Sequence, residues 1–167
     1  MPQETVTDRS AETEIGIAGA MLKRLTPHPD ERGFFMELIR VTDPFFSEGF
    51  AQWSHSKMFP GVAKAWHIHK TQVDWWYVPI GTLKVALHDL REASPTRGVT
   101  HTLLLGEDYP PAILKIPPGV AHGCKAIGSI AHLFYITSRT YDPAEEGRIP
   151  HDDPSIGYDW VRGAAIT

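Results

Sequence analysis

The stretch GVAKAWHIHKTQVDWWYVPIG, residues 61–81, indicates the fold and holds the most informative polar side chains of the chain. Two runs with the alternation of β-strands flank a short polar turn, which is typical of an antiparallel pair. Side chains alternate between the two faces of a strand, so His67 and His69 point the same way. The turn then brings Asp74 back opposite this pair, on the face that suits a barrel interior.

The same organisation extends along most of the chain. The 14 glycines and 14 prolines among 167 residues recur between short apolar runs, which breaks helices and suits turns. Residues 41–48 hold a short helical turn. Many short strands at close spacing predict an all-β sandwich or barrel, and the jelly roll is one such closure. The expected strands cover residues 52–59, 63–69, 75–80, 83–89, 100–105, 112–116 and 131–137.

Length and composition limit the classes of protein to consider. A chain of 167 residues suits one domain, and a net charge of −4 without a concentrated basic face argues against nucleic-acid binding. The single cysteine, Cys124, excludes an internal disulfide and is typical of a reducing compartment. The apolar residues 15–22 are too few to span a bilayer. We therefore expect a cytoplasmic protein without membrane contact.

Residues 1–14, MPQETVTDRSAETE, are polar and lack a periodic apolar pattern. Such a segment cannot bury enough apolar surface to fold by itself, so we expect a loose tail or an arm swapped with a partner chain. Residues 15–167 form the expected single domain, in which neither an internal repeat nor a linker is found.

A second motif brings a third histidine toward the first two. In IPPGVAH, residues 116–122, a Pro-Gly turn delivers His122 to the start of a strand. The side chains of His67, His69, Asp74 and His122 are therefore expected to converge. Such a set suits a divalent ion, Fe, Mn, Ni, Zn or Cu, among which these ligands discriminate poorly. The alternative is a metal-free hydrogen-bond network in which Asp74 orients His67 as a base.

The spacing of these residues resembles the signature of the cupin superfamily. Its first motif is a glycine, five residues, HxH, three or four residues, an acid, six residues and a glycine, and every element occurs between Gly61 and Gly81. The acid here is Asp74 rather than the usual glutamate. The second cupin motif is matched in part by PPGVAH, residues 117–122. The resemblance implies an all-β, single-domain cupin jelly-roll barrel.

The chain also resembles the dTDP-4-dehydrorhamnose 3,5-epimerase family, itself built on a cupin barrel, from about residue 29 to residue 160. This resemblance implies an epimerase or isomerase that acts on a 4-keto-6-deoxy sugar carried by a nucleoside diphosphate. It also implies a homodimer and no organic cofactor. The matching stretches include DERGFFMEL from Asp30, GVAKAWH from Gly61, DLREASPTRG from Asp89, IPPGVAHG from Ile116 and LFYITSRTYDPAEEG from Leu133.

By this resemblance, His67 falls on the catalytic base of the family, Tyr135 on its general acid and His122 on a further active-site histidine. The family chemistry removes a proton next to the C4 ketone of the sugar and returns one to the opposite face. The family positions that contact the nucleotide correspond to Arg32, Phe35, Glu37 and Gln52, and two more carry exchanges, Ser54 for an asparagine and Lys64 for an arginine.

Two departures from the family bear on the mechanism. Asp74 takes the place of a lysine near the ketone, and the chain stops before the segment whose aspartate supports the base. A carboxylate repels an enolate unless a cation lies between them. His69 and Asp74 together therefore suit a metal ion that stabilises the enolate in place of the lysine. If His67 binds the metal, it has no lone pair left to act as the base. Tyr135, His55 or a metal-bound water would then be the base.

Three functions therefore remain open from the sequence. The first is the sugar-nucleotide epimerase, with or without help from a metal. The second is a metal-dependent cupin enzyme, a dioxygenase or a lyase, that acts on another small acid or keto compound. The third is a sugar-binding cupin without catalysis, which the loss of the family lysine would explain.

Overall fold

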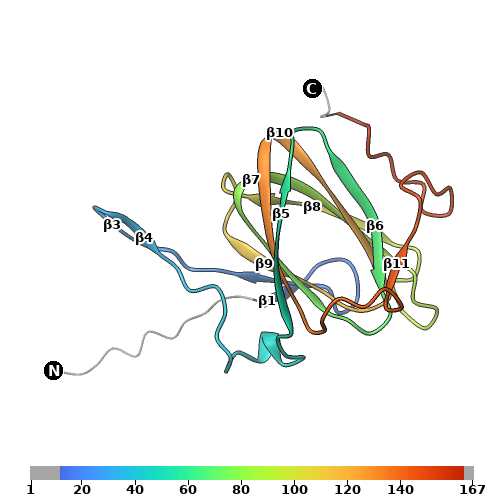
Figure 1. The fold of residues 1–167 in the computed structure, drawn as a ribbon, viewed down its shortest axis with the longest axis horizontal. Helices are drawn as coiled ribbons and strands as arrows, with labels where there is room; N and C mark the ends of the chain where they lie inside the picture. Colours follow the sequence, from blue (N-terminus) through green and yellow to red (C-terminus); the bar gives the residue numbers. More distant parts are fainter. Residues whose placement is uncertain (1–11, 164–167) are drawn as a thin grey trace.

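The computed structural model describes residues 12–163 and consists almost entirely of β-strands (Figure 1). This confirms the expected all-β fold class. Within these residues the helical content is a 3-10 turn, η1 (Pro44–Phe46), and no helix is long and apolar enough to cross a membrane. The strands are β1 (Glu12–Glu14), β2 (Met21–Arg24), β3 (His28–Asp30), β4 (Gly33–Phe35), β5 (Gln52–Met58), β6 (Ala63–His69), β7 (Asp74–Asp89), β8 (Thr100–Gly106), β9 (Ala112–Ile116), β10 (Val120–Thr137) and β11 (Glu146–Arg148).

Nine strands form one antiparallel sheet that curls into the barrel (Figure 1). Its order is β1-β2-β9-β7-β10-β6-β11, while β5 also pairs with β10 and β8 with β7. The long strands β7 and β10 pair with each other, and each changes its second neighbour along its length. The first part of β10 lies beside β6 and its last part beside β5. The two long strands therefore connect the opposite sides of the barrel.

Most of the polar N-terminal segment that the sequence sets apart, residues 1–11, lies outside the described residues. Its last three residues form β1, which pairs with β2 at the edge of the large sheet. The strands β3 and β4 make a separate two-stranded hairpin that projects away from the barrel (Figure 1).

Gly81 lies where β7 bends across β10. Its φ of +71° is a left-handed conformation that favours glycine, and a Cβ there would stand 2.2 Å from the carbonyl oxygen of Ile130. The backbone N–H of Gly81 donates to the carboxylate of Glu107 at 2.8 Å. The bend thus requires a residue without a side chain, because another strand passes at backbone contact distance.

A buried carboxylate anchors the loop that follows β7. Asp89 is fully buried and accepts hydrogen bonds from Arg91, Ser94 and Thr96, the last at 2.6 Å. Burial alone would raise the pKa of Asp89, but these hydrogen bonds hold it well below its usual range. Arg91 also donates to the carbonyl oxygen of Ala18 at 2.7 Å. The DLREASPT segment therefore has a structural role, because it holds the loop after β7 against the chain around Ala18.

The strands of the barrel share one main apolar core. It is built largely from β7, β9 and β10, with fully buried side chains such as Leu83 and Leu114. Burying a leucine side chain stabilises the fold by about 1.5–3 kcal/mol. Three members of this core, Trp76, Cys124 and Leu133, also line the polar pocket described below. The apolar core therefore forms part of the wall of the pocket.

Candidate functional site

The barrel holds a pocket of about 620 Å³. Its walls come from β5, β6, β7, β10 and β11, so segments far apart in the sequence meet there. Seven of the residues that the sequence marks as functional line it. They are Gln52, Lys64, His67, His69, Asp74, His122 and Tyr135.

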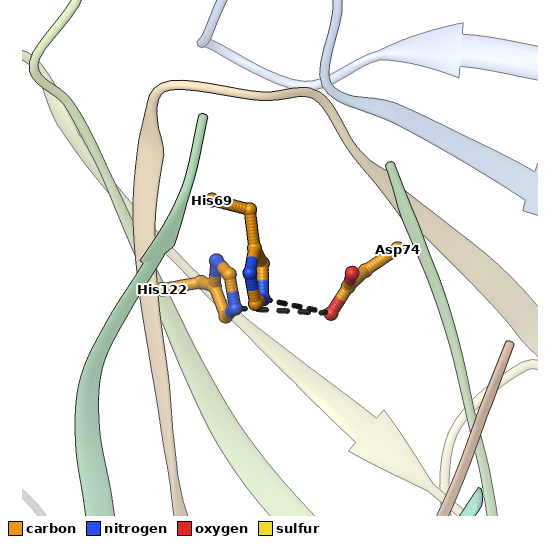
Figure 2. Close-up of side chains that lie close together, drawn as sticks. All are labelled: His69, Asp74 and His122. Carbon is orange, nitrogen blue, oxygen red and sulfur yellow. Dashed lines mark ion pairs between the residues drawn. The ribbon is translucent and has the colours of Figure 1, made fainter. Parts of the chain in front are cut away.

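Three of these side chains lie closest together (Figure 2). The Nε2 atoms of His69 and His122 each lie 3.8 Å from Oδ2 of Asp74, and one ligand atom from each residue falls within 4.8 Å of the others. Distances of 3.8 Å are too long for direct hydrogen bonds. Ligand atoms around a tetrahedral ion with bonds of about 2.1 Å stand roughly 3.4 Å apart, so a small inward movement would suit an ion.

Hydrogen bonds decide which atoms of this cluster face one another. Nδ1 of His122 lies 3.0 Å from the carbonyl oxygen of Val120, which can only accept, so Nδ1 carries the proton. Burial lowers the pKa of His122, although Asp74 opposes this, and Nε2 is left with a bare lone pair. The carboxylate of Asp74 is itself held by donors from Gln72 and Trp76, at 2.8 and 3.2 Å. Two acceptors then face each other, and a cation between them would satisfy both.

His67 points into the same pocket but has another partner. Its Nδ1 lies 2.8 Å from Oε1 of Glu146 on β11, and its ring centroid is 6.2 Å from that of His122. It is not a member of the close group of three. Burial lowers the pKa of His67, and Arg148 adds to this, while Glu146 opposes it. At neutral pH the imidazole is therefore mostly neutral and has a nitrogen free to accept a proton.

Tyr135 lines the pocket from β10, where it pairs with Ser54 of β5 on one side and Trp76 of β7 on the other. Its phenol is half-buried and is both donor and acceptor. The pocket thus presents an imidazole from one strand and a phenol from another, which are the two group types that a proton exchange at carbon requires.

The polar residues of β5 and β6 form a second side of the pocket. Nζ of Lys64 donates to Oγ of Ser56 at 2.8 Å, which directs a positive charge into the pocket. The amide of Gln52 donates to Oγ of Ser54 at 3.0 Å and accepts from the backbone N–H of Tyr141. Ser54 itself does not line the pocket. Lys64 and Gln52 are accordingly placed where a charged, polar part of a ligand would lie.

Besides Ser54, three expected nucleotide-binding residues do not line this pocket. Arg32 and Phe35 belong to the projecting β3–β4 hairpin, and Glu37 follows it (Figure 1). The guanidinium of Arg32 donates to Asp30 in the same hairpin, and Glu37 is paired with Arg40. Within one chain, the structure does not bring these three side chains to the other site residues.

Two further placements were not evident from the sequence. Glu146, the partner of His67, sits on a strand of three residues, which is too short to show an alternating pattern. His55 lies on the outer face of β5, where its Nε2 is 2.8 Å from Nδ1 of His132 and its ring stacks on Phe134. It does not line the pocket and is therefore not placed to serve as a base there.

The fold and pocket together define a small jelly-roll barrel of the cupin type with an imidazole-rich interior, a class that solved structures support. A dTDP sugar isomerase from Desulfovibrio desulfuricans G20 superposes with a TM-score of 0.85 and 32% identity, covering 91% of this chain and 97% of that one. RmlC from Legionella pneumophila Philadelphia 1, solved in complex with dTDP-4-keto-L-rhamnose, gives a TM-score of 0.79 at 26% identity, over 94% and 86%.

Sequence comparison identifies the family. The family model described as dTDP-4-dehydrorhamnose 3,5-epimerase matches residues 14–167. The spore coat polysaccharide biosynthesis protein SpsL of Bacillus subtilis (strain 168) is 46% identical over 147 residues, which cover 86% of this chain and 96% of that protein. The chain therefore belongs to the dTDP-4-dehydrorhamnose 3,5-epimerase family. The expected class of enzyme, a sugar-nucleotide epimerase, is confirmed.

Proposed function

We propose that this protein epimerises a 4-keto-6-deoxy sugar carried on a nucleoside diphosphate, with dTDP as the carrier. The observation that carries this proposal is the presence of His67 and Tyr135 in one pocket, on strands β6 and β10. The Legionella enzyme with the same fold, solved with dTDP-4-keto-L-rhamnose, supports the choice of substrate class.

The proposed reaction is a proton exchange at carbon. A C–H bond next to a ketone is acidic because the electron pair it leaves moves onto the oxygen as an enolate. The unprotonated nitrogen of His67 takes the proton, and the enolate collapses as the hydroxyl of Tyr135 gives a proton to the other face of that carbon. The imidazolium of His67 then releases its proton to water, and the tyrosinate regains one from water, so both groups return to their starting states. The configuration at the carbon is inverted without a change in oxidation state.

The diphosphate side of the substrate is proposed to lie along β5 and β6. Lys64 supplies a positive charge, and Gln52 supplies an amide at the same wall of the pocket. An ammonium acts on a phosphate as a point charge and lacks the forked geometry of a guanidinium. Recognition by this wall alone is therefore expected to be weaker than recognition through an arginine, and Ser54 contributes only by holding Gln52.

We also propose that His69, Asp74 and His122 bind a divalent metal ion. The distances, the burial and the two facing acceptors all suit a cation, and Fe, Mn, Ni, Zn and Cu each accept such ligands. An ion bound there would supply positive charge near the ketone oxygen, which is the contribution that the family lysine makes at the position of Asp74. His67 is not a member of this close group, and the contact of its Nδ1 with Glu146 leaves Nε2 available to act as the base.

A homodimer is proposed on the evidence of the β3–β4 hairpin. Phe34 and Phe35 are 66% and 65% exposed on a segment that projects from its own barrel (Figure 1). Apolar side chains exposed in this way typically mark a contact surface. We propose that the hairpin reaches the partner's pocket and delivers Arg32, Phe35 and Glu37 to the nucleotide there. A loose tail or swapped arm in the part of the N-terminal segment that precedes β1 is a further proposal, and so is a cytoplasmic location.

Solvent exchange tests the proposed activity. In deuterium oxide, dTDP-4-keto-6-deoxyglucose incubated with the protein is expected to gain deuterium next to the ketone, as measured by mass spectrometry and proton NMR. His67→Asn should abolish this exchange, whereas Tyr135→Phe should retain exchange and lose net inversion. His55→Asn, on the outer face of β5, is the matched control and should behave as the wild type.

Other outcomes of the same assay would replace the proposal. Consumption of oxygen without exchange would favour a cupin dioxygenase, and cleavage of the substrate would favour a lyase. Saturable binding of the sugar nucleotide without exchange would favour a sugar-binding protein that has lost catalysis.

A further inference from the structure

The carboxylate of Glu146 is placed to act on His67. Its Oε1 lies 2.8 Å from Nδ1 of His67, and its side chain is 13% exposed while that of His67 is 32% exposed. The strand β11 pairs with β6 so that Glu146 lies opposite His69 and Arg148 opposite His67. All four side chains line the same pocket, and the contact to His67 runs diagonally across the two strands.

This contact fixes the tautomer of His67. Arg148 Nη2 donates to the same carboxylate oxygen at 3.1 Å. An ionised carboxylate can only accept hydrogen bonds, so Nδ1 of His67 carries the hydrogen. The lone pair of the neutral ring is then on Nε2, the nitrogen that Glu146 does not contact.

We propose that Glu146 is the positioning residue of this enzyme, which holds His67 so that Nε2 accepts the proton from the substrate. This inference rests on the proposed epimerase function. When the C–H bond breaks, its electron pair moves toward the ketone oxygen and its proton binds Nε2. The hydrogen on Nδ1 stays on the ring, and the new imidazolium charge faces the carboxylate. Glu146 itself neither gains nor loses a proton, so atoms and charges balance within His67 and the substrate.

The base lies outside the close group of proposed metal ligands. His69, Asp74 and His122 gather around one point, while His67 is held by Glu146 of the neighbouring strand β11. A histidine held by Glu146 at Nδ1 keeps Nε2 for the substrate only if it stays outside the metal cluster. The geometry therefore divides four polar residues of one pocket into a base and a separate group of three.

The test compares Glu146→Gln with Glu146→Asp. Glutamine keeps the size but presents an uncharged amide that can also donate, which permits the other tautomer. We expect kcat for solvent exchange to fall by about 100-fold or more in Glu146→Gln, with KM changed by less than about threefold. Glu146→Asp should recover part of kcat, because it restores the charge. Asp152→Asn, which removes an exposed carboxylate outside the pocket, is the control and should match the wild type.

A spectroscopic measurement keeps the inference falsifiable without turnover. Nitrogen-15 NMR of the imidazole of His67 in the ligand-free protein should show the Nδ1–H tautomer in the wild type and a gain of the Nε2–H tautomer in Glu146→Gln. An Nε2–H tautomer in the wild type, or an unchanged kcat in Glu146→Gln, would overturn the role of Glu146. Absence of exchange in a wild type that shows the Nδ1–H tautomer would sink the epimerase proposal and leave the His67–Glu146 contact standing.

Discussion

His67 and His69 are two residues apart on one strand, yet they have different partners. The first contacts Glu146, and the second lies 3.8 Å from Asp74. Alternation along β6 puts both side chains on the same face, but it is the neighbouring strands that distinguish them. β11 supplies a carboxylate to one histidine and the start of β7 supplies a carboxylate to the other. A pair that looks equivalent in the sequence is thus divided into two roles.

At the scale of single residues, the proposed metal site predicts that purified protein retains bound metal ions. Wild-type protein incubated with Mn, Fe, Ni, Zn or Cu salts and then desalted should retain roughly one divalent ion per chain, as measured by plasma mass spectrometry. Asp74→Asn should lower the affinity by about 10- to 100-fold, because an amide oxygen is a poorer ligand than a carboxylate. His132→Asn, which removes a half-buried histidine outside the pocket, is the control.

Retention of no ion by the wild type would contradict this prediction, and so would equal retention by Asp74→Asn. Chelation offers a second readout, since a chelator should slow solvent exchange in the wild type. Full activity after chelation, with no metal left, would show that the reaction does not need an ion at this site.

Part of the site can be predicted from the sequence, because it depends on local spacing. Strand alternation and one turn suffice to place His67, His69 and Asp74 in one pocket. Glu146 is not predictable in this way, because 79 residues separate it from His67 and its strand has only three residues. Which nitrogen of His67 is free depends on that contact, so the sequence leaves the choice between base and ligand open.

At the scale of the strands, alternation predicts most of the barrel but not the continuity of its longest strands. Residues 75–80 and 83–89 are expected as two strands, and the structure joins them in β7. Gly81 is typical of a turn, yet here it allows a bend within one strand because β10 passes close to it. The short strands β2, β3, β4 and β11 have three or four residues and are defined by pairing, which a local pattern does not contain.

The bend in β7 predicts that adding a single methyl group at residue 81 strongly destabilises the fold. Gly81→Ala should lower the free energy of unfolding by about 2–4 kcal/mol, since the new methyl group would overlap the carbonyl oxygen of Ile130. Gly61→Ala is the matched control, because Gly61 has a similar φ of +78° but open space around its Cβ position. That variant should cost only about 1 kcal/mol.

Urea denaturation followed by tryptophan fluorescence measures both changes. Equal losses for the two variants would mean that the left-handed backbone, and not the close approach of β10, sets the requirement for glycine at residue 81.

At the scale of the whole molecule, the distance of the β3–β4 hairpin from its own pocket predicts complementation between chains. Arg32→Ala and His67→Asn protomers, co-expressed with different tags and purified as the mixed dimer, should recover activity. One of the two sites then combines an intact barrel with an intact hairpin. At low substrate concentration we expect about half of the wild-type rate per mixed dimer.

The outcome distinguishes two architectures. A mixed dimer no more active than the average of its parents would mean that the hairpin serves its own barrel, and a monomer by light scattering would exclude the exchange altogether. Recovery would explain why Arg32, Phe35 and Glu37 are absent from the walls of the pocket in a single chain.

The strand β11 has three residues and β6 as its paired neighbour, so it lies at an edge of the sheet. Edge segments of this length open locally at a small fraction of the free energy that melts a core. Each such opening would detach the carboxylate from its histidine while the barrel stays closed. On heating, activity would then be lost when this three-residue edge strand opens. The fold itself would melt only at the higher temperature at which the long strands separate.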